Sequence, residues 1–385
     1  MFHGKQVDQL DDSSAGRRLD WLPLSELPAG VKIVVSTLPD CNEFRCHSIL
    51  REGLGEASAS NLIHVEASLR YEKMLEHLLR LRRRTLTQEQ MAHVCGVYGQ
   101  GAQGEVGTPL WLTIVAQVVS TWTSFDGIPF NIKPALRELI KDLLDRLRAA
   151  HGATLVCATL AHILLTKGIS ETELNHVLSL DDDVLVEAYE WWLPPVRIVP
   201  PVLIARLLSD LSPYLTRRGE GSGGELISWY HREFWQGSHA WLFGDASGGD
   251  AVLRRRHGEL ADYFCGRWAG KAKPYNEALK RKCLGGETAA DRMVPPQPLV
   301  LAGALFGDSS CADALPRLNA RRLSQLVHHL IKSSQVDKTA RELISPEYIA
   351  AKFFICDGSM LMREYSLAIR EFSSVAAGNK SSETQ

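Results

Sequence analysis

The chain lacks the long apolar runs that place a protein in a membrane or direct it across one. No window of the 385-residue sequence approaches the roughly 20 apolar residues that a membrane-spanning helix needs. The first residues, MFHGKQVDQLDDSS, contain no apolar segment of the kind found in a secretory signal peptide. We therefore expect a cytoplasmic protein that makes no use of a membrane.

An excess of one charge is also missing. Lys and Arg number 43, Asp and Glu number 45, and the formal net charge is -2, so no overall field draws the protein to nucleic acid or to an anionic surface. Apolar residues make up 45% and charged residues 23%, which is typical of a globular protein and not of a disordered one. The length predicts about two or three domains.

Cysteine patterns that bind metal or perform catalysis are absent. The eight cysteines are scattered, and the closest pair, Cys41 and Cys46, has neither C-x-x-C spacing nor a second ligand pair nearby. We expect reduced thiols that act as small core residues, and no zinc site. No Ser-His-Asp or Cys-His set stands out by spacing, because 13 His and 8 Cys allow many chance pairings.

The sequence has no phosphate-binding loop. The pattern G-x-x-x-x-G-K-[ST], whose backbone amides and Lys cradle phosphates, does not occur. GQGAQG, residues 99–104, matches G-x-G-x-x-G, but it ends a predicted helix and does not connect a strand to a helix, as dinucleotide binding requires. The basic runs at 81–85 and 253–258 are predicted to be solvated faces of helices.

Two short segments near the N-terminus have strand patterns. VKIVVSTLP, residues 31–39, is a β-branched run that is apolar on both faces, as in a central strand of a parallel sheet. NLIHVE, residues 61–66, predicts a second short strand. After these segments the apolar residues recur at helical spacing almost throughout.

Local signals mark where the first helices begin and end. Thr87 and Gln90 form a capping box, and Pro109 occupies the first turn of a buried helix, PLWLTIVAQVVSTW. An amphipathic helix and a more buried one follow, and Gly168 is predicted to stop the second.

From residue 170 the order of elements indicates a winged helix. Ser170 and Glu173 form another capping box, two further helices begin at DDDVLVEA and at PPVLIARLLSDL, and YLTRR with LISWY predicts a β-hairpin. In a DNA-binding winged helix the helix before the hairpin would carry basic and amide side chains. Here it offers Arg206 and Asp210 among aliphatic residues, so nucleic-acid binding is disfavoured and the helix is predicted to be buried.

The expected fold class is mainly α, in four parts. Residues 1–68 hold the predicted strands, residues 69–168 form a small helical domain, residues 169–245 form a winged-helix domain with its hairpin, and residues 246–385 are helical. In the last part, a Gly-, Pro- and Ser-rich stretch at 280–310 predicts a linker or loop. Three short helices then follow, as at the start of a helical repeat array.

A set of short motifs, taken in order, resembles a known family. WLPLSELPAGVKIVVSTLP, GTPLWL, GISETELNHVLSLDDD, YHREF, HGELADYF and NARRLSQLVHHL are similar to segments of NACHT-type STAND NTPases, in the subgroup with C-terminal WD40 or other repeats. The resemblance covers about residues 5 to 355. It implies that residues 1–68 are the remnant of a parallel αβ nucleotide-binding sheet. It also implies that nucleotide bound between this core, the helical domain and the winged helix switches the molecule between closed and open forms.

The resemblance assigns two residues to nucleotide binding. Pro109, in the Gly-Thr-Pro element at 107–109, corresponds to a proline that packs near the adenine. His231 follows the hairpin, where the family places a His that reaches the β-phosphate of bound diphosphate.

Two interpretations of His231 stay open when the residues are considered alone. Helix N–H groups and the positive end of the helix dipole favour an anion at a strand-to-helix junction, and an imidazole there can add a hydrogen bond to phosphate. Alternatively, His231 caps the helix or is satisfied in the core, with Arg232 and Glu233 on the solvated face. The residues predicted to anchor it in the core are Trp229, Tyr230, Phe234 and Trp235.

The chain departs from the family at the positions that perform catalysis. The phosphate-binding loop is missing, and Lys5 stands three residues before Asp8, where a magnesium-facing Asp is expected. The hydrophobic strand before it is absent as well. We therefore expect no hydrolysis, no catalytic residue, no metal and no cofactor for this chain; ATP or ADP with magnesium would belong to a longer parent.

Three functions follow from these observations. The first is a non-catalytic regulatory and interaction module that acts as a nucleotide-state lid and a scaffold. It would bind protein partners through its C-terminal helices and could oligomerise on activation. The second is part of an ATP- or GTP-hydrolysing switch whose P-loop lies upstream of Met1. The third is a nucleic-acid-binding winged-helix adaptor.

Overall fold

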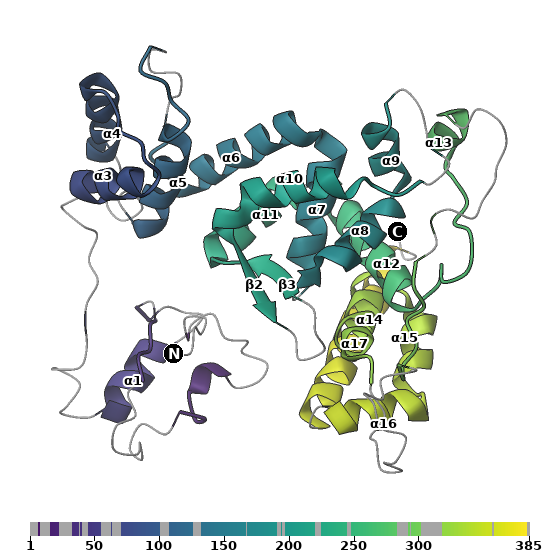
Figure 1. The fold of residues 1–385 in the computed structure, drawn as a ribbon. Helices are drawn as coiled ribbons and strands as arrows, with labels where there is room; N and C mark the ends of the chain where they lie inside the picture. The colour runs from purple at the N-terminus through teal and green to yellow at the C-terminus, as the bar shows by residue number, and fades with distance from the viewer. Residues whose placement is uncertain are drawn as a thin grey trace, which may run out of the picture.

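In the part of the chain that the structure describes, the protein is mainly helical with one small three-stranded antiparallel sheet (Figure 1). The computed structural model describes residues 16–22, 33–37, 45–54, 71–100, 108–125, 132–166, 168–190, 197–219, 225–244, 248–282, 294–301, 318–355 and 358–382, with residues 7, 39, 40, 63, 194 and 292. Within these residues, no helix combines the length and the apolar character that crossing a bilayer requires.

The N-terminal part has a short 3-10 helix at Gly16–Arg18 and helix α1 at Cys46–Leu54. The strand predicted over 31–39 is wrong for residues 33–37, which adopt no strand, and Val34 is 95% exposed. A strand needs hydrogen-bonded neighbours, and the backbone bond found here among described residues runs from Val7 N to Ser36 O at 3.0 Å. Residues 31, 32 and 38 lie outside the described residues, as does the second predicted strand except for Ile63, which is not in a strand.

Helices α3 (Tyr71–Leu81), α4 (Gln88–Gln100) and α5 (Pro109–Val119) lead into two longer ones, α6 (Leu136–His151) and α7 (Ala153–Leu165). The predicted capping box is confirmed, since Gln90 N donates to Thr87 Oγ1 and Thr87 N donates to Gln90 Oε1. The buried helix at Pro109 is also confirmed, with Trp111, Leu112 and Ile114 fully buried. These five helices share one apolar core that continues into the elements after them.

The sheet consists of β1 (Ile169–Ser170), β2 (Leu215–Gly219) and β3 (Glu225–Trp229), in the order β1-β3-β2. The predicted hairpin is confirmed, because β2 and β3 pair antiparallel with Leu215 opposite Trp229. Strand β1 was not predicted, and it pairs with β3 through Ile169 and Ile227. Between β1 and β2 lie α8 (Glu171–Ser179), α9 (Asp182–Ala188), α10 (Pro201–Leu211) and a 3-10 turn at Ser212–Tyr214.

Helix α8 begins at the second predicted capping box, which is confirmed. Glu173 N donates to Ser170 Oγ at 3.1 Å, and Ser170 N donates to Glu173 Oε2 at 2.9 Å. Helix α7 ends three residues before Gly168, whose φ of +121° carries the chain into β1. This φ is one that residues with a side chain rarely adopt.

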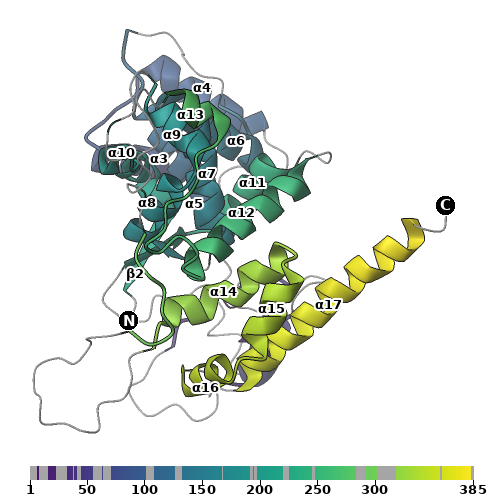
Figure 2. The ribbon, with the colours of Figure 1, turned by 90° about the vertical axis from the view of Figure 1, so that its right-hand side faces the viewer.

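Helices α11 (Arg232–Phe243), α12 (Gly249–Phe264) and α13 (Glu277–Lys282) follow the sheet. The last part contains α14 (Ala320–Lys332), α15 (Val336–Leu343), α16 (Pro346–Ile355) and α17 (Gly358–Ser382). Helices α14 to α17 form a unit with its own apolar core, and α17 extends away from it at its C-terminal end (Figure 2). A separate apolar cluster joins α12 and α8 to α14, so α14 belongs to both regions.

Candidate functional site

The junction between β3 and α11 contains His231, the first residue predicted to face a nucleotide. Its φ of −127° and ψ of 143° are extended, and it is the N-cap of α11. The ring Nδ1 accepts a hydrogen bond from Glu233 N at 3.2 Å. The sequence thus predicts the strand-to-helix position, and the geometry observed is the capping one. Whether His231 also faces a nucleotide stays a prediction.

Two aromatic side chains fix this junction in the core. The rings of Trp229 and Phe234 lie 5.7 Å apart at 11°, and Tyr214 contacts Phe234 at 4.5 Å. Trp229 and Phe234 are 8% and 1% exposed, as predicted. The same prediction is wrong for Tyr230 and Trp235, which are 69% and 45% exposed, because neighbouring positions on a strand or a helix point in different directions.

The capping bond determines which nitrogen of His231 can donate. A neutral imidazole that accepts at Nδ1 carries its proton on Nε2, so Nε2–H is the group that can donate to a phosphate oxygen. The first turn of α11 adds backbone N–H groups and the positive end of the helix dipole. Glu233 places a carboxylate in the same turn, which opposes an anion at close range. Arg232 and Glu233 are half-buried, so they do not lie on a fully solvated face.

Pro109, the second predicted residue, lies at the start of α5. Thr108 is the N-cap and accepts from Trp111 N at 3.3 Å, while Pro109 itself is exposed at the first helical position. Gly107 of the same element lies outside the described residues. Helix α5 packs against α3 and α6, and α11 packs against α6 and α7. The two predicted residues are thus on helices that share α6 as a neighbour.

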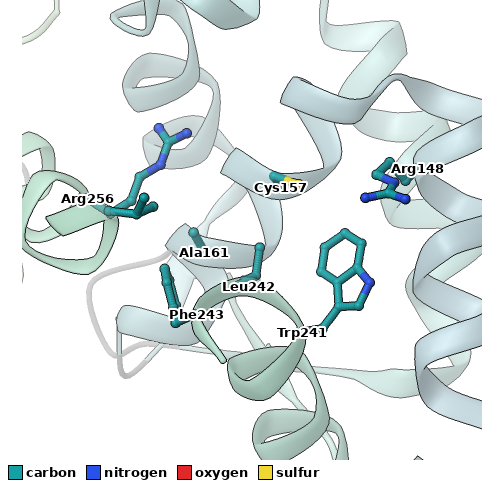
Figure 3. Close-up of a pocket in the computed structure, with 8 residues that line it drawn as sticks. Arg148, Cys157, Ala161, Trp241, Leu242, Phe243 and Arg256 are labelled. Carbon is teal, nitrogen blue, oxygen red and sulfur yellow. The ribbon is translucent and has the colours of Figure 1, made fainter. Parts of the chain in front are cut away.

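A pocket of about 240 Å³ lies between α6, α7, α11 and α12. Figure 3 shows Cys157 and Ala161 between Arg256 on one side and Trp241 with Arg148 on the other. Its volume is below the roughly 300–1,000 Å³ of typical ligand pockets. It also lies at the far end of α11 from His231, about 15 Å away for ten residues of helix rise. This pocket is therefore separate from the predicted nucleotide-facing residues.

The two arginines of this pocket are already paired. Arg148 lies over the Trp241 ring at 5.5 Å and pairs with Asp145 at 3.2 Å. Arg256 is 7% exposed and binds Asp181 as well as Glu259, the latter at 2.8 Å. The prediction that the basic run at 253–258 is a solvated helix face is therefore wrong for Arg256, which is buried and pairs with a carboxylate in the interior.

Asp181 connects α9 to α12, because it caps α9 and pairs with Arg256 of α12. Its side chain caps α9 by accepting from Asp183 N at 3.1 Å. Burial alone would raise the pKa of this carboxyl, but the charges of Arg256 and Arg255, with the hydrogen bonds from Arg256 and from Asp183 N, together lower the pKa. Asp181 is therefore a structural anion, and no proton-transfer role follows from it.

Three histidines form a cluster that the sequence does not predict. His257 on α12 and His328 with His329 on α14 bring their ring nitrogens within 4.8 Å of one another. His257 Nδ1 and His329 Nδ1 are 2.8 Å apart, and His329 Nε2 lies 3.2 Å from Gln325 Oε1. Burial lowers the pKa of His257 to about 3 and lowers that of His329 far below its ordinary value. The one signal in the sequence is the adjacent pair His328 and His329, because His257 is 71 residues from His328.

The surface of α10 bears on the nucleic-acid alternative. Its buried face consists of Ile204, Leu207, Leu208 and Leu211, so the prediction that the helix is buried holds for one face. The exposed face carries Arg206 as its basic side chain and Asp210, which binds His151 Nε2 at 2.7 Å. One guanidinium beside one carboxylate offers little to a DNA phosphate backbone.

Comparison with known proteins gives distant relatives. The chain is 30% identical over 342 residues to NACHT domain- and WD repeat-containing protein 1 of Homo sapiens. The aligned region is 88% of this chain and 20% of that protein. It is 29% identical over 356 residues to NACHT and WD repeat domain-containing protein 2 of Homo sapiens, and this aligned region is 86% of this chain and 19% of that protein. No protein-family profile and no solved structure matches the chain. The chain spans about a fifth of the length of these curated relatives, and it is a distant homologue of the NACHT and WD repeat-containing proteins 1 and 2.

Proposed function

We propose that this chain is the non-catalytic, regulatory part of a NACHT-type switch protein. In this proposal α3 to α7 form the small helical domain, and α8 to α11 with the sheet form the winged helix. The chain acts as a lid that senses the nucleotide state of a phosphate-binding core, and α14 to α17 act as an interaction scaffold.

The observation that carries the proposal is the order of elements that ends at His231. The elements follow the winged-helix order: a helix, the short strand β1, further helices, and then a hairpin whose second strand, β3, pairs with β1. The homology to proteins named for a NACHT domain supports the same assignment. His231 follows the last strand directly and opens a 12-residue helix, which is a position suited to an anion.

The first test is enzymatic. Without a phosphate-binding loop, the backbone amides and the Lys that hold the transferred phosphate are missing, so purified protein with ATP and magnesium should release no phosphate above the buffer control. ATP turnover that co-purifies with the chain through two different columns would refute the non-catalytic assignment.

The second test separates the lid role of His231 from its capping role. His231→Asn keeps a side-chain acceptor that caps α11 well, but it removes the imidazole N–H. His231→Ala removes both. In the longer parent protein, both variants should lose bound diphosphate during purification, whereas only His231→Ala should lose stability, by about 0.5–2 kcal/mol.

His239→Asn on the same helix is the matched control and should leave nucleotide content unchanged. Bound diphosphate that is equal in His231→Asn and wild type would remove His231 from the nucleotide site. Pro109→Ala should have a milder effect on nucleotide retention.

A second candidate function is a working ATP- or GTP-hydrolysing switch whose phosphate-binding loop lies in a longer parent. The small share of each relative that the chain spans favours this candidate. Transcript sequence upstream of Met1 distinguishes the two, since an in-frame G-K-[ST] stretch would supply the missing loop.

We also propose that the C-terminal helices contact protein partners. Large apolar side chains are exposed on α16 and α17, with Phe353 at 58%, Phe354 at 57%, Met362 at 65% and Ile369 at 67%. Contiguous exposed apolar patches mark interaction surfaces, and α16 and α17 pack against each other. Replacing Phe353 and Ile369 with Ser should abolish co-purification of a partner, and retained co-purification would place the partner elsewhere.

A further inference from the structure

The packing of α12 against α14 brings three imidazoles to one point. His257 is 4% exposed and His329 is fully buried, while His328 is partly exposed. The ring centroids are separated by 5.1 Å for His257 and His329, 5.3 Å for the adjacent pair on α14, and 5.7 Å for His257 and His328. The rings thus form a nearly equilateral triangle, with one corner toward solvent.

The size of this triangle fits a transition-metal ion. A Zn²⁺–N bond of about 2.0–2.1 Å places each ring centroid about 3.2 Å from the ion, so two rings at the tetrahedral angle are about 5.2 Å apart. The observed separations lie within about half an ångström of that value. Among the described residues no carboxylate joins the group, so three imidazoles would leave one coordination position for water or a further ligand.

The hydrogen bonds around His329 prepare it as a ligand. The contact between His329 Nε2 and Gln325 Oε1, at 3.2 Å, places the proton of this ring on Nε2. The lone pair of Nδ1 then accepts a hydrogen bond from His257 Nδ1, 2.8 Å away, and a bound ion would replace the shared proton and move the two nitrogens to about 3.3 Å apart. A partner that holds the second nitrogen of a metal-binding His is the usual arrangement around such ions, and Gln325 is 2% exposed.

Positive side chains near the cluster are compensated by their own partners. Lys332, whose charge acts on His257, pairs with Glu371 at 2.8 Å. Arg321, whose charge acts on His329, pairs with Glu173 at 2.8 Å. A divalent cation at the cluster therefore does not face an unbalanced positive field.

We propose that His257, His328 and His329 bind a divalent transition-metal ion of the Zn²⁺ type. The bound ion would hold α12 and α14 together. Imidazole nitrogen is a ligand that suits Zn²⁺ and neighbouring divalent ions, whereas Mg²⁺ and Ca²⁺ prefer oxygen. Because α14 leads into the C-terminal helices, the ion would stiffen the connection to the proposed scaffold. The site stands independently of the nucleotide role of His231.

The test uses the full chain without a histidine tag. Zn²⁺ is titrated in competition with a chromophoric chelator, and Co²⁺ is used as a second probe because a tetrahedral Co²⁺–imidazole complex absorbs visible light. One ion should bind per chain. His328→Gln, at the partly exposed corner, should weaken Zn²⁺ binding by at least about 100-fold, since even loss of an outer-shell partner costs about 10–100-fold.

Matched variants keep the outcome decisive. His77→Gln on α3 changes an exposed His outside the cluster and should bind Zn²⁺ as wild type does. His257→Gln tests the other helix, and its melting curve without metal shows whether it folds. Absence of stoichiometric binding to wild type at micromolar Zn²⁺, or equal affinity in His328→Gln and His77→Gln, would overturn the site.

Discussion

Lys352 on α16 gives the most direct test of what holds the C-terminal helices together. Its side chain is 1% exposed, and Nζ donates to Glu364 Oε1 at 2.6 Å and to Leu323 O at 2.7 Å. Tyr348 joins the group, since its hydroxyl donates to Glu364 Oε2 at 2.9 Å. One ammonium therefore links α14, α16 and α17.

The cost of removing this ammonium follows from what it leaves behind. Lys352→Met fills similar space but leaves the Glu364 carboxylate without its cation and the Leu323 carbonyl without its donor. Breaking a buried ion pair costs about 3–5 kcal/mol. Glu364 keeps the Tyr348 hydrogen bond and is 15% exposed, so we expect the lower end, about 3 kcal/mol. Replacing both partners, as in Lys352→Met with Glu364→Met, should cost less than Lys352→Met alone, because no charge then remains buried.

Hydrogen exchange measured by mass spectrometry on α14, α16 and α17 is the suitable assay, because a chain with several units does not unfold in one step. Lys338→Met is the control, since Lys338 makes a surface pair with Asp262 at 3.5 Å and should change stability by less than about 1 kcal/mol. The reasoning would be refuted if Lys352→Met changed the opening free energy by under about 1 kcal/mol, or if the double variant were less stable than Lys352→Met.

Further substitutions test other parts of the molecule. Gly168→Ala puts a side chain at φ +121° with its Cβ 3.1 Å from Leu226 Cβ, so it should destabilise the protein by about 2 kcal/mol or more. A Cβ at Gly96 would meet nothing within 4 Å, so Gly96→Ala should stabilise α4 by up to about 1 kcal/mol. Thermal melts that rank the two variants in the opposite order would contradict this. Burial lowers the pKa of His162 to about 3, with Arg256, Asp181, Arg255 and His257 as the nearby charges. Below about pH 6.5 the His162 imidazole therefore binds a proton in the unfolded state but not in the folded state. Stability should fall by up to about 1.4 kcal/mol per pH unit from pH 6.5 down to 3. His162→Leu should make the opening free energy of α7, measured by hydrogen exchange, less dependent on pH. An unchanged slope would show that His162 does not contribute. His231→Asn and His231→Ala, compared in the longer parent that we propose, complete the set.

Elements whose signals are local in the chain were predictable from the sequence. Both capping boxes depend on residues three positions apart, and Thr87 with Gln90 and Ser170 with Glu173 form them as expected. The hairpin was predictable for the same reason. Short helices without such signals were missed: α1, α13 and α15 have nine, six and eight residues. Helix α13 depends on a distant contact, because Lys282 Nζ donates to the carbonyls of Val186 and Tyr189 at the end of α9.

Features that depend on residues far apart in the chain could not be predicted. The strand expected at 31–39 failed over residues 33–37 because strand propensity does not supply the neighbouring strand. The histidine cluster escaped notice because α12 and α14 meet only in the folded protein. For His231 the sequence predicted the position, and the capping bond to Glu233 N became visible only with the backbone in place.

The bond network of Glu173 has a mechanical consequence. Its carboxylate completes the first turn of α8 and also receives Nε and Nη2 of Arg321 from α14, whose Nη2 further reaches Gly168 O at 2.8 Å. Glu173 thus caps the start of α8 and also connects α8 to α14. Moving the C-terminal helices away from β1 would break the bonds of Arg321 to Glu173 and Gly168 and leave the Glu173 carboxylate, whose side chain is 12% exposed, without its cation, so such a movement carries an electrostatic cost.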